Sequence, residues 1–559
     1  SFAAEGLKVK GLSASFTVKN TGARSGAYVA QLYLTARGGE AKQRLAGFAR
    51  VELKAGESKP VTLTVDPRIL ADWTAKGWTI KGGQYSFALG DDAEHLGGAV
   101  NTAVAAYAAS PTGANRWRAP QPVAAWKGVR SGADYGHDCA QAPFPPDAAP
   151  IITTPAEDCL YLNVWKPTAA KAGGKLPVMV WIHGGGFVNG GSSPAVYSGQ
   201  PFGRDGVVFV SLNYRLGRYG FFAHPALASE GLGGNFGFLD QIAALQWVKA
   251  NVAKFGGDPS RVTVFGESAG GMSMHMLLQS PLARGLYSQI VIESGGGRNG
   301  TLPQPTMAKA ARIGAQFAPG LTAAQLRALP EEKVTGGLSM MSRAADTYSG
   351  PMVDGRTILG APDDAIAAGL TANVPVIVGA NSADGFAFGT DKDKVFAQFG
   401  ADADAARKVY DADGSKPAGH IAMGASADKM FIEPARHVAR SMAARGQKVW
   451  LYRFGYAVPK MAAAIGGAPH ASELPYVFDT VAARKGDAPL PEEQPVASLT
   501  HRYWVNFVKN GKPDGGDVAP WPQATPKDTT VQVIDGKGAA HEEDPYTARM
   551  DFTASQSGN

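Results

Sequence analysis

The sequence is poor in cysteine and has no long apolar run. Its two cysteines, Cys139 and Cys159, belong to no cluster with the spacing of metal ligands, so we expect no metal site. Taken alone, the pair can form a disulfide or remain two buried thiols. No apolar run reaches the roughly 18 residues that a membrane span needs, so we expect no transmembrane helix. The segment after Ser1 has neither the charged nor the apolar region of a signal peptide.

Charge is not concentrated anywhere in the chain. Lys and Arg number 54 and Asp and Glu 48, for a net charge of +6, and no basic run interleaves with aromatic residues. This pattern favours solubility and excludes nucleic acid as the expected partner. With 45% hydrophobic and 18% charged residues the chain has the composition of a globular protein, and its 559 residues allow one large domain and a small one.

The first part of the chain, up to about residue 103, contains short alternating runs separated by turn residues. The runs lie at residues 13–18, 30–34 and 60–65, and the turns at 20–22, 54–57 and 81–83. Alternation with period two and closely spaced turns predicts a small all-β, immunoglobulin-like sandwich over residues 1–103.

From about residue 175 apolar strand-like runs alternate with helical segments. Residues 238–255 place Phe238, Ile242, Leu245 and Val248 three or four apart, which predicts a helix with one buried stripe. Strands that alternate with helices indicate a mainly parallel sheet covered on both faces, and we expect extended loops over residues 104–174. Strands are predicted at residues 177–182, 207–212, 261–265, 289–292, 374–378, 448–452 and 531–534.

The segment Gly266-Glu-Ser-Ala-Gly270 follows one of these strands and precedes a helical stretch. This is the strand, turn and helix context in which a serine nucleophile is exposed. Ser268 must adopt a strained backbone there, and side chains two residues to either side of it would collide, which explains the two glycines. The pattern predicts Ser268 as the nucleophile.

A second glycine-rich segment, His183-Gly-Gly-Gly-Phe187, lies at the end of an earlier strand. Acyl transfer places negative charge on an oxygen, and a glycine run can turn several backbone N–H groups toward one point. We expect Gly185 and Gly186 to donate to this oxygen together with the N–H of Ala269. We expect His183 to order the loop rather than to transfer protons.

A serine nucleophile needs a histidine that accepts its proton and an acid that orients this histidine. The acid and then the histidine are expected downstream of the serine. His470 lies in a loop rich in Gly and Pro, whereas His437 and His501 fall in predicted helices. For the acid, Asp384 follows the strand that ends at Val378, and Asp354 is its rival. The other histidines well downstream of Ser268 are His420 and His541.

From about residue 104 to the C-terminal region, the sequence resembles the type B carboxylesterases, the cholinesterase-like group of the α/β-hydrolase superfamily. The N-terminal part resembles the fibronectin-type-III-like module that closes many family 3 glycoside hydrolases. The first resemblance rests on Glu157-Asp-Cys-Leu-Tyr-Leu-Asn163, the glycine loop after His183, Asn213-Tyr-Arg-Leu-Gly217, Gly234-Asn-Phe-Gly-Phe-Leu-Asp-Gln241, the elbow at Ser268, and His470 with Glu473.

The resemblance implies an α/β-hydrolase fold over residues 104–559 and the same catalytic set. It implies Ser268 as nucleophile, His470 as general base and then acid, and Asp384 as the third member. It implies Gly185, Gly186 and Ala269 as the oxyanion hole. It also implies a disulfide between Cys139 and Cys159, because the family carries a bridge at the Glu-Asp-Cys segment, and hence a secreted or periplasmic protein.

Three departures from the family pattern are visible. The acid, usually Glu, is Asp384, which is one methylene shorter and requires its loop to come closer to the histidine. Ala471 follows His470 where the family usually has Gly. The family's opening strands are missing, so we expect an unusual sheet edge.

The expected activity is hydrolysis of a small-molecule carboxylic ester through an acyl-enzyme on Ser268, without metal or organic cofactor. The segment between the cysteines contains Phe144 but no Trp, which disfavours choline esters. The alternatives are an adhesion or binding module on the same fold, and an acyl esterase acting on polysaccharide, such as a feruloyl or acetyl esterase. Contact with a glycan through the N-terminal sandwich is a further expectation.

Overall fold

A computed structural model describes most of the chain. The described residues are 2–10, 12–22, 24–37, 40–74, 77–80, 85–90, 100–125, 132, 134–228, 230–231, 233–299, 304–342, 346–484 and 488–557.

The chain divides into two compact units. One unit is Ser1–Asn101 with Trp165–Lys171 and Phe202–Gly206, and the other holds the remaining residues. The boundary expected between residues 103 and 104 falls within strand β9 (Val100–Ala106).

The N-terminal unit contains two three-stranded antiparallel sheets that share one core. The core includes Phe16 and Val18 of one sheet and Leu32 and Leu34 of the other, and these residues are at most 3% exposed. The predicted small sandwich is therefore confirmed. The turns at 20–22 and 54–57 are present, and the one at 81–83 lies outside the described residues. The first sheet contains β1 (Phe2–Lys10), β2 (Ser13–Asn20) and β5 (Ser58–Thr64), in that order. The second contains β4 (Glu40–Leu53), β3 (Gly26–Arg37) and β8 (Tyr85–Gly90). A separate hairpin is formed by β6 (Ala71–Thr74) and β7 (Gly77–Ile80).

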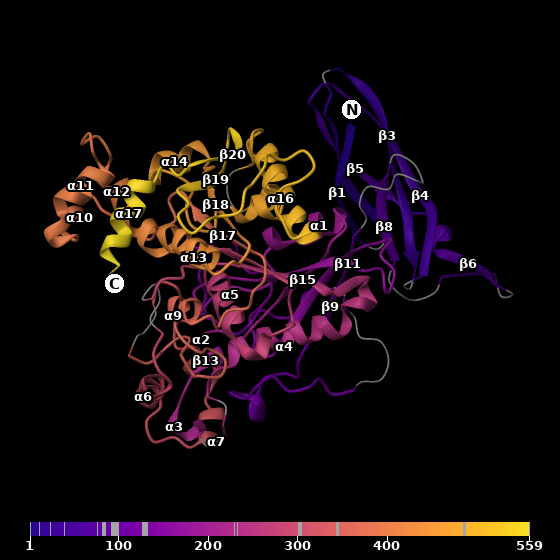
Figure 1. Ribbon diagram of the computed structural model, residues 1–559. Coiled ribbons are helices and arrows are strands. Elements are labelled where there is room, and N and C mark those ends of the chain that lie inside the picture. Colours follow the sequence, from indigo (N-terminus) through magenta and orange to yellow (C-terminus); the bar gives the residue numbers. More distant parts are fainter. Residues whose placement is uncertain are drawn as a thin grey trace. The chain divides into compact units, whose positions relative to one another are not determined.

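The large unit is built on a ten-stranded sheet, several of whose strands are labelled in Figure 1. The neighbouring strands from β12 (Val208–Leu212) through β19 (Thr530–Asp535) in the sheet pair in parallel. Each predicted strand is present within a few residues of its expected bounds. In spatial order the strands are β20 (Gly538–Glu543), β19 (Thr530–Asp535), β18 (Val449–Phe454), β17 (Val376–Asn381), β16 (Gln289–Glu293), β15 (Gly257–Glu267), β11 (Leu176–Ile182), β12 (Val208–Leu212), β10 (Tyr161–Pro167) and β9.

Helices cover both faces of this sheet because successive strand residues point to opposite sides. Val178, Val180 and Ile182 of β11 lie in one core with α4, α5 and α13. Trp181, between them, packs on Phe478 at 5.1 Å, on the side where Trp450 meets Phe507 of α16. The longer helices are α4 (Phe236–Asn251), α5 (Ala269–Gln279), α6 (Met307–Phe317), α11 (Ala403–Tyr410), α12 (Ala418–Ala427), α13 (Glu433–Ala444), α16 (Glu493–Asn510) and α17 (Thr547–Gln556).

The expectation of extended loops over residues 104–174 is wrong at β10, whose residues Leu162, Asn163, Val164 and Trp165 are buried. A strand between other strands is covered on both faces and loses the alternating pattern, and Asn163 is accommodated by donating to Ser192 and Ser211. At the sheet edge, β9 occupies the outermost position.

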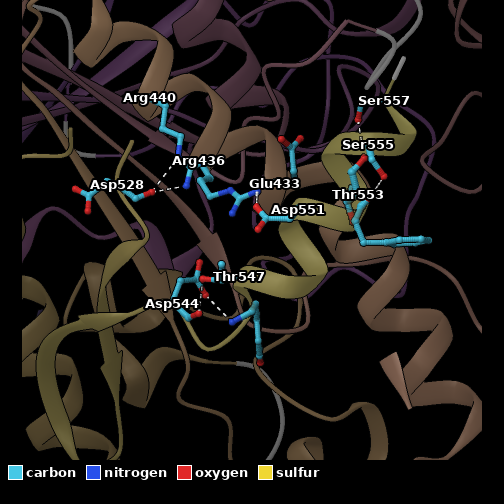
Figure 2. Close-up of polar contacts among 12 residues, drawn as sticks. Glu433, Arg436, Arg440, Asp528, Asp544, Thr547, Asp551, Thr553, Ser555 and Ser557 are labelled. Carbon is cyan, nitrogen blue, oxygen red and sulfur yellow. Dashed lines mark hydrogen bonds and ion pairs between the residues drawn. The ribbon is translucent and has the colours of Figure 1, made fainter. Parts of the chain in front are cut away.

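The C-terminal helix α17 packs against α13 (Figure 2). Asp551 of α17 lies 2.9 Å from the buried Arg436 of α13, and Arg440 of α13 donates to the backbone oxygen of Asp528. Within the described residues no helix combines the length and the apolarity needed to cross a membrane.

Candidate active site

Ser268 lies at the junction between β15 and α5. Its backbone angles are φ 57° and ψ −121°, a region that is strained for any residue with a Cβ. A Cβ on Gly270 would lie 2.0 Å from the oxygen of Ile182, and one on Gly266 would lie 2.6 Å from the carbonyl carbon of Gly270. Both positions therefore require glycine for the steric reason inferred from the sequence.

The loop after β11, which contains Gly185 and Gly186, passes beside the serine elbow, where a Cβ on Gly184 would lie 3.1 Å from Cβ of Ser268. Gly185 and Gly186 have positive φ, 98° and 62°, and a Cβ on Gly185 would lie 2.1 Å from the oxygen of Asn189. The N–H groups of Gly185 and Gly186 donate to no residue in the described part of the chain. The N–H of Ala269 opens α5, where helix geometry provides no acceptor. All three N–H groups are thus without an acceptor among the described residues.

His183 is buried and holds the start of this loop. Its Nδ1 lies 2.9 Å from the oxygen of Gly184, and its ring stacks on Tyr214 at 4.5 Å. Burial lowers the pKa of His183 to about 4, although the Gly184 carbonyl acts in the opposite direction. A neutral, enclosed imidazole agrees with the ordering role expected for it.

His470 and Asp384 meet on two adjacent loops. Nδ1 of His470 lies 2.6 Å from Oδ1 of Asp384, which is completely buried. The other oxygen of Asp384 accepts hydrogen bonds from the N–H of Asn381 at 2.9 Å and from the hydroxyl of Ser294 at 2.5 Å. These partners fix the carboxylate and leave it one oxygen for the imidazole.

The loops of Asp384 and His470 are bonded to each other directly. The N–H of Ala383 donates to the oxygen of Ala468 at 2.9 Å, and the side chain of Asn381 donates to the oxygen of Pro469 at 2.8 Å. This close approach is what the shorter aspartate side chain requires.

Buried carboxylates surround the imidazole. Oε1 of Glu267 lies 3.1 Å from Nε2 of His470, and Glu473 is completely buried and accepts a hydrogen bond from Asn381. Burial disfavours the imidazolium, but Glu267 and Asp384 outweigh it and raise the pKa of His470 to about 9. Burial raises the pKa of Glu267 well above its usual range and that of Glu473 to about 7.

Ala471, the residue after His470, has φ 62°. This left-handed conformation costs an alanine roughly 1–2 kcal/mol, whereas glycine adopts it freely. The alanine found here in place of the glycine usual in the family is therefore strained.

The rival acid and the other histidines lie elsewhere. Asp354 accepts hydrogen bonds from the N–H groups of Arg356, Thr357 and Ile358 and from Asn235, so it closes its own loop. His437 lies in α13 against Asp363, and His501 lies in α16, as expected for helical positions. His420 lies in α12 and His541 in β20.

Ser268 and His470 line one cavity of about 850 Å³. Gly185 belongs to its wall, and the described residues around it include no tryptophan. Most of the other lining side chains are apolar: Phe144, Val196, Met340, Phe386, Met461, Leu474 and Leu490.

The two cysteines form a disulfide whose Cα atoms are 4.9 Å apart. The segment that it closes contributes Phe144, Pro146 and Asp147 to the cavity wall. The bridge thus restrains one side of the cavity.

Sequence reasoning missed several residues around the imidazole. Ser294 and Asn381 bind Asp384, and the rings of Phe386 and Phe431 lie 4.8 and 4.9 Å from that of His470. They lie at strand ends, in a loop and in a helix, and these positions carry no local signal. Only the position of Ser294 just after β16, at the same sheet edge as Ser268, could have suggested it.

Comparison with known proteins gives two family matches. Residues 105–553 match the Carboxylesterase family, and residues 28–93 match the Fibronectin type III-like domain.

Curated relatives cover most of the chain. The Fumonisin B1 esterase of Sphingopyxis macrogoltabida is 35% identical over 441 residues, which are 75% of this chain and 80% of that protein. The Para-nitrobenzyl esterase of Bacillus subtilis (strain 168) is 34% identical over 459 residues, 77% and 90% of the two chains. A solved PNB esterase structure superposes with a TM-score of 0.68 at 30% identity and covers 81% of this chain and 95% of that one. The predicted fold, an α/β-hydrolase unit preceded by a small sandwich, is confirmed by these likenesses and by the sheet topology.

Proposed function

The chain belongs to the carboxylesterase family and is a serine carboxylesterase, and on this premise we propose that Ser268, His470 and Asp384 cleave the ester. The observation that carries the proposal is the 2.6 Å contact between His470 and Asp384 beside a cavity that Ser268 lines from a strained elbow.

The first half-reaction acylates the serine. Oγ of Ser268 attacks the ester carbonyl carbon while Nε2 of His470 takes the hydroxyl proton. Asp384 accepts the Nδ1 proton in a hydrogen bond and stabilises the imidazolium. The tetrahedral intermediate then expels the alcohol, which leaves with the proton from Nε2.

Negative charge on the carbonyl oxygen is stabilised by backbone donors. The N–H groups of Gly185, Gly186 and Ala269 have no acceptor among the described residues, so they need not break a bond to receive this oxygen. Each such donor contributes roughly 10²-fold or more in rate.

The second half-reaction repeats the first with water. His470 takes a proton from water as the water oxygen attacks the acyl-enzyme, and it returns a proton to Ser268 as the carboxylic acid leaves. The serine and the imidazole end in their starting states.

The test is Ser268→Ala. It should lower kcat for p-nitrophenyl acetate by roughly 10⁴ to 10⁶. Ser280→Ala is the matched control, because Ser280 is a buried serine at the other end of the same helix and lies outside the cavity. A Ser268→Ala enzyme as active as this control would refute the assignment. A fluorophosphonate probe should label the parent once, on Ser268; the adhesion-module alternative requires no labelling.

The cavity is largely apolar and its described lining residues include no tryptophan, which supports uncharged, largely apolar esters as substrates. A panel of p-nitrophenyl esters of increasing chain length, together with a choline ester, tests this preference. Faster hydrolysis of the choline ester than of every neutral ester would contradict it.

Secretion or a periplasmic location follows as a proposal from the disulfide, which persists in oxidising compartments. Fractionation of the native host tests it.

Glycan contact is proposed for the sandwich. Phe48 of β4 is 64% exposed and pairs in register with Gln31 of β3, which places an aromatic ring beside an amide. The full chain should be retained on insoluble xylan, and Phe48→Ala should reduce the retention. Equal retention of the parent and of Phe48→Ala would show that the face around Phe48 does not bind the glycan.

A further inference from the structure

A widened helical turn lies next to the imidazole. The helix that runs from α12 into α13 contains a π-helical segment, η7 (Asp428–Ile432), between them. Pro434 follows in the first turn of α13, where its missing N–H and its ring disfavour regular α-helical bonding to the turn before it. Turns of this kind are rare and occur frequently at functional sites.

The π-helical segment places Phe431 on His470. The two rings are nearly parallel, at 14°, with their centroids 4.9 Å apart, and Phe431 is 1% exposed. Phe386 approaches the same imidazole edge-on at 4.8 Å, but it is 44% exposed. Of the two rings that contact the imidazole, the buried Phe431 is thus the one held in place by its surroundings.

The C-terminal helix α17 holds this segment. Arg549 of α17 donates two hydrogen bonds of 2.8 Å to the fully buried Asp428, which also accepts from the hydroxyl of Tyr410 at 2.8 Å. Met550 of α17 packs in the same apolar cluster as Phe431. One residue further, Asp551 reaches Arg436 of α13 (Figure 2).

We propose that α17 is a positioning element for the general base: it holds η7 through Arg549 and Asp428, and η7 holds the ring of His470 through Phe431. This inference rests on the proposed function of His470. The imidazole must keep its alignment in both half-reactions, and small displacements of a catalytic group are costly in rate. The face of Phe431 also favours the imidazolium that forms in each half-reaction.

The charged groups that face the imidazole are the same with and without Phe431. Asp384 lies at Nδ1, Glu267 lies near Nε2, and Glu473 is buried beside them. A change in the pH dependence after substitution of Phe431 therefore reports the loss of the aromatic face.

The first experiment compares Phe431→Leu with Phe396→Leu in the full chain. Phe396 is also completely buried but makes no ring contact with His470. Phe431→Leu should lower kcat roughly tenfold at nearly constant KM. It should also move the acid limb of kcat/KM to lower pH by roughly 0.5 to 1 unit. Phe396→Leu should leave the acid limb in place, whatever stability it costs.

The second experiment compares Arg549→Lys with Asp551→Asn. Lysine keeps the charge but cannot make the paired hydrogen bonds to Asp428, so kcat should fall about three- to tenfold, with the same direction of acid-limb shift. Asp551 is 62% exposed and bonds to α13 rather than to η7, so its variant should behave as the parent. All rates are divided by active sites titrated with fluorophosphonate, which removes misfolded enzyme from the comparison.

An unchanged kcat and acid limb in Phe431→Leu, or in Arg549→Lys, overturns the proposal. A shift of equal size in Phe396→Leu or Asp551→Asn also overturns it, because the effect would then be general loosening. Failure of the proposed function is distinguishable, since it would appear as a Ser268→Ala enzyme that stays active and as a parent enzyme that the probe does not label on Ser268.

Discussion

The substitution Glu267→Gln replaces the carboxyl group beside the proposed base by a neutral amide of the same shape. Burial raises the pKa of Glu267, but an imidazolium 3.1 Å away acts in the opposite direction and favours the carboxylate. Burial would lower the pKa of His470, but Glu267 and Asp384 raise it to about 9. The sign follows directly: loss of the Glu267 charge disfavours the imidazolium, so the pKa of His470 falls. The neutral imidazole is the base, so the acid limb of kcat/KM should move to lower pH.

The size of the shift follows from the distance. Opposite unit charges 3.1 Å apart interact by about 1.3 kcal/mol at the dielectric constant of water and by about 5 kcal/mol at an effective dielectric of about 20. Since 1.36 kcal/mol corresponds to one pKa unit, the acid limb should move down by at least about one unit.

The assay is the pH dependence of kcat/KM for a p-nitrophenyl ester whose leaving group is followed at its pH-independent wavelength. The parent should gain activity up to about pH 9 because the pKa of His470 is raised to about 9. If Glu267→Gln leaves the acid limb where the parent has it, Glu267 carries no charge in the working enzyme, because its burial outweighs the imidazolium, and the reasoning is refuted.

Three further predictions follow from the contacts around the site. Asp384→Asn should lower kcat by roughly 10⁴-fold, because the amide favours the wrong tautomer, whereas Asp354→Asn should retain kcat and only lower the thermal midpoint; the reverse pattern in initial rates would make Asp354 the acid. Ala471→Gly should raise the free energy of unfolding in urea by about 0.5–1 kcal/mol, and no gain would show that φ 62° is not strained here. Replacing both cysteines, Cys139 and Cys159, by serine should lower that free energy by about 3 kcal/mol, and a loss below about 1 kcal/mol would show that the unbridged segment is already constrained.

The parts of the site that were predictable depend on local steric or chemical rules. Ser268 is marked by glycines that no Cβ could replace, and Gly185 by the same kind of close approach. His470 could be singled out because it lies in a Gly and Pro loop, whereas His437 and His501 lie in helices. The strands of the parallel sheet were visible because burial on both faces makes each a continuous apolar run.

The parts that were not predictable depend on which segments the fold brings together. Phe431 reads as one apolar residue in a helical stretch, and its contact with His470 arises only from the π-helical turn. Ser294 and Asn381 bind Asp384 from the ends of β16 and β17, and apart from the position of Ser294 at the sheet edge their local sequences do not mark them. Strand β10 was missed because Pro, Ala and Gly on either side dominated the local composition.

The disulfide has a practical consequence for changing what the enzyme accepts. The segment between Cys139 and Cys159 begins and ends at Cα atoms 4.9 Å apart and supplies Phe144, Pro146 and Asp147 to the cavity. Such a segment is a covalently closed cassette, whose two anchor points stay fixed when its contents change. Exchanging it whole for the corresponding cassette of another carboxylesterase would transplant one wall of the substrate chamber while Ser268, Asp384 and His470 remain on their own strands and loops.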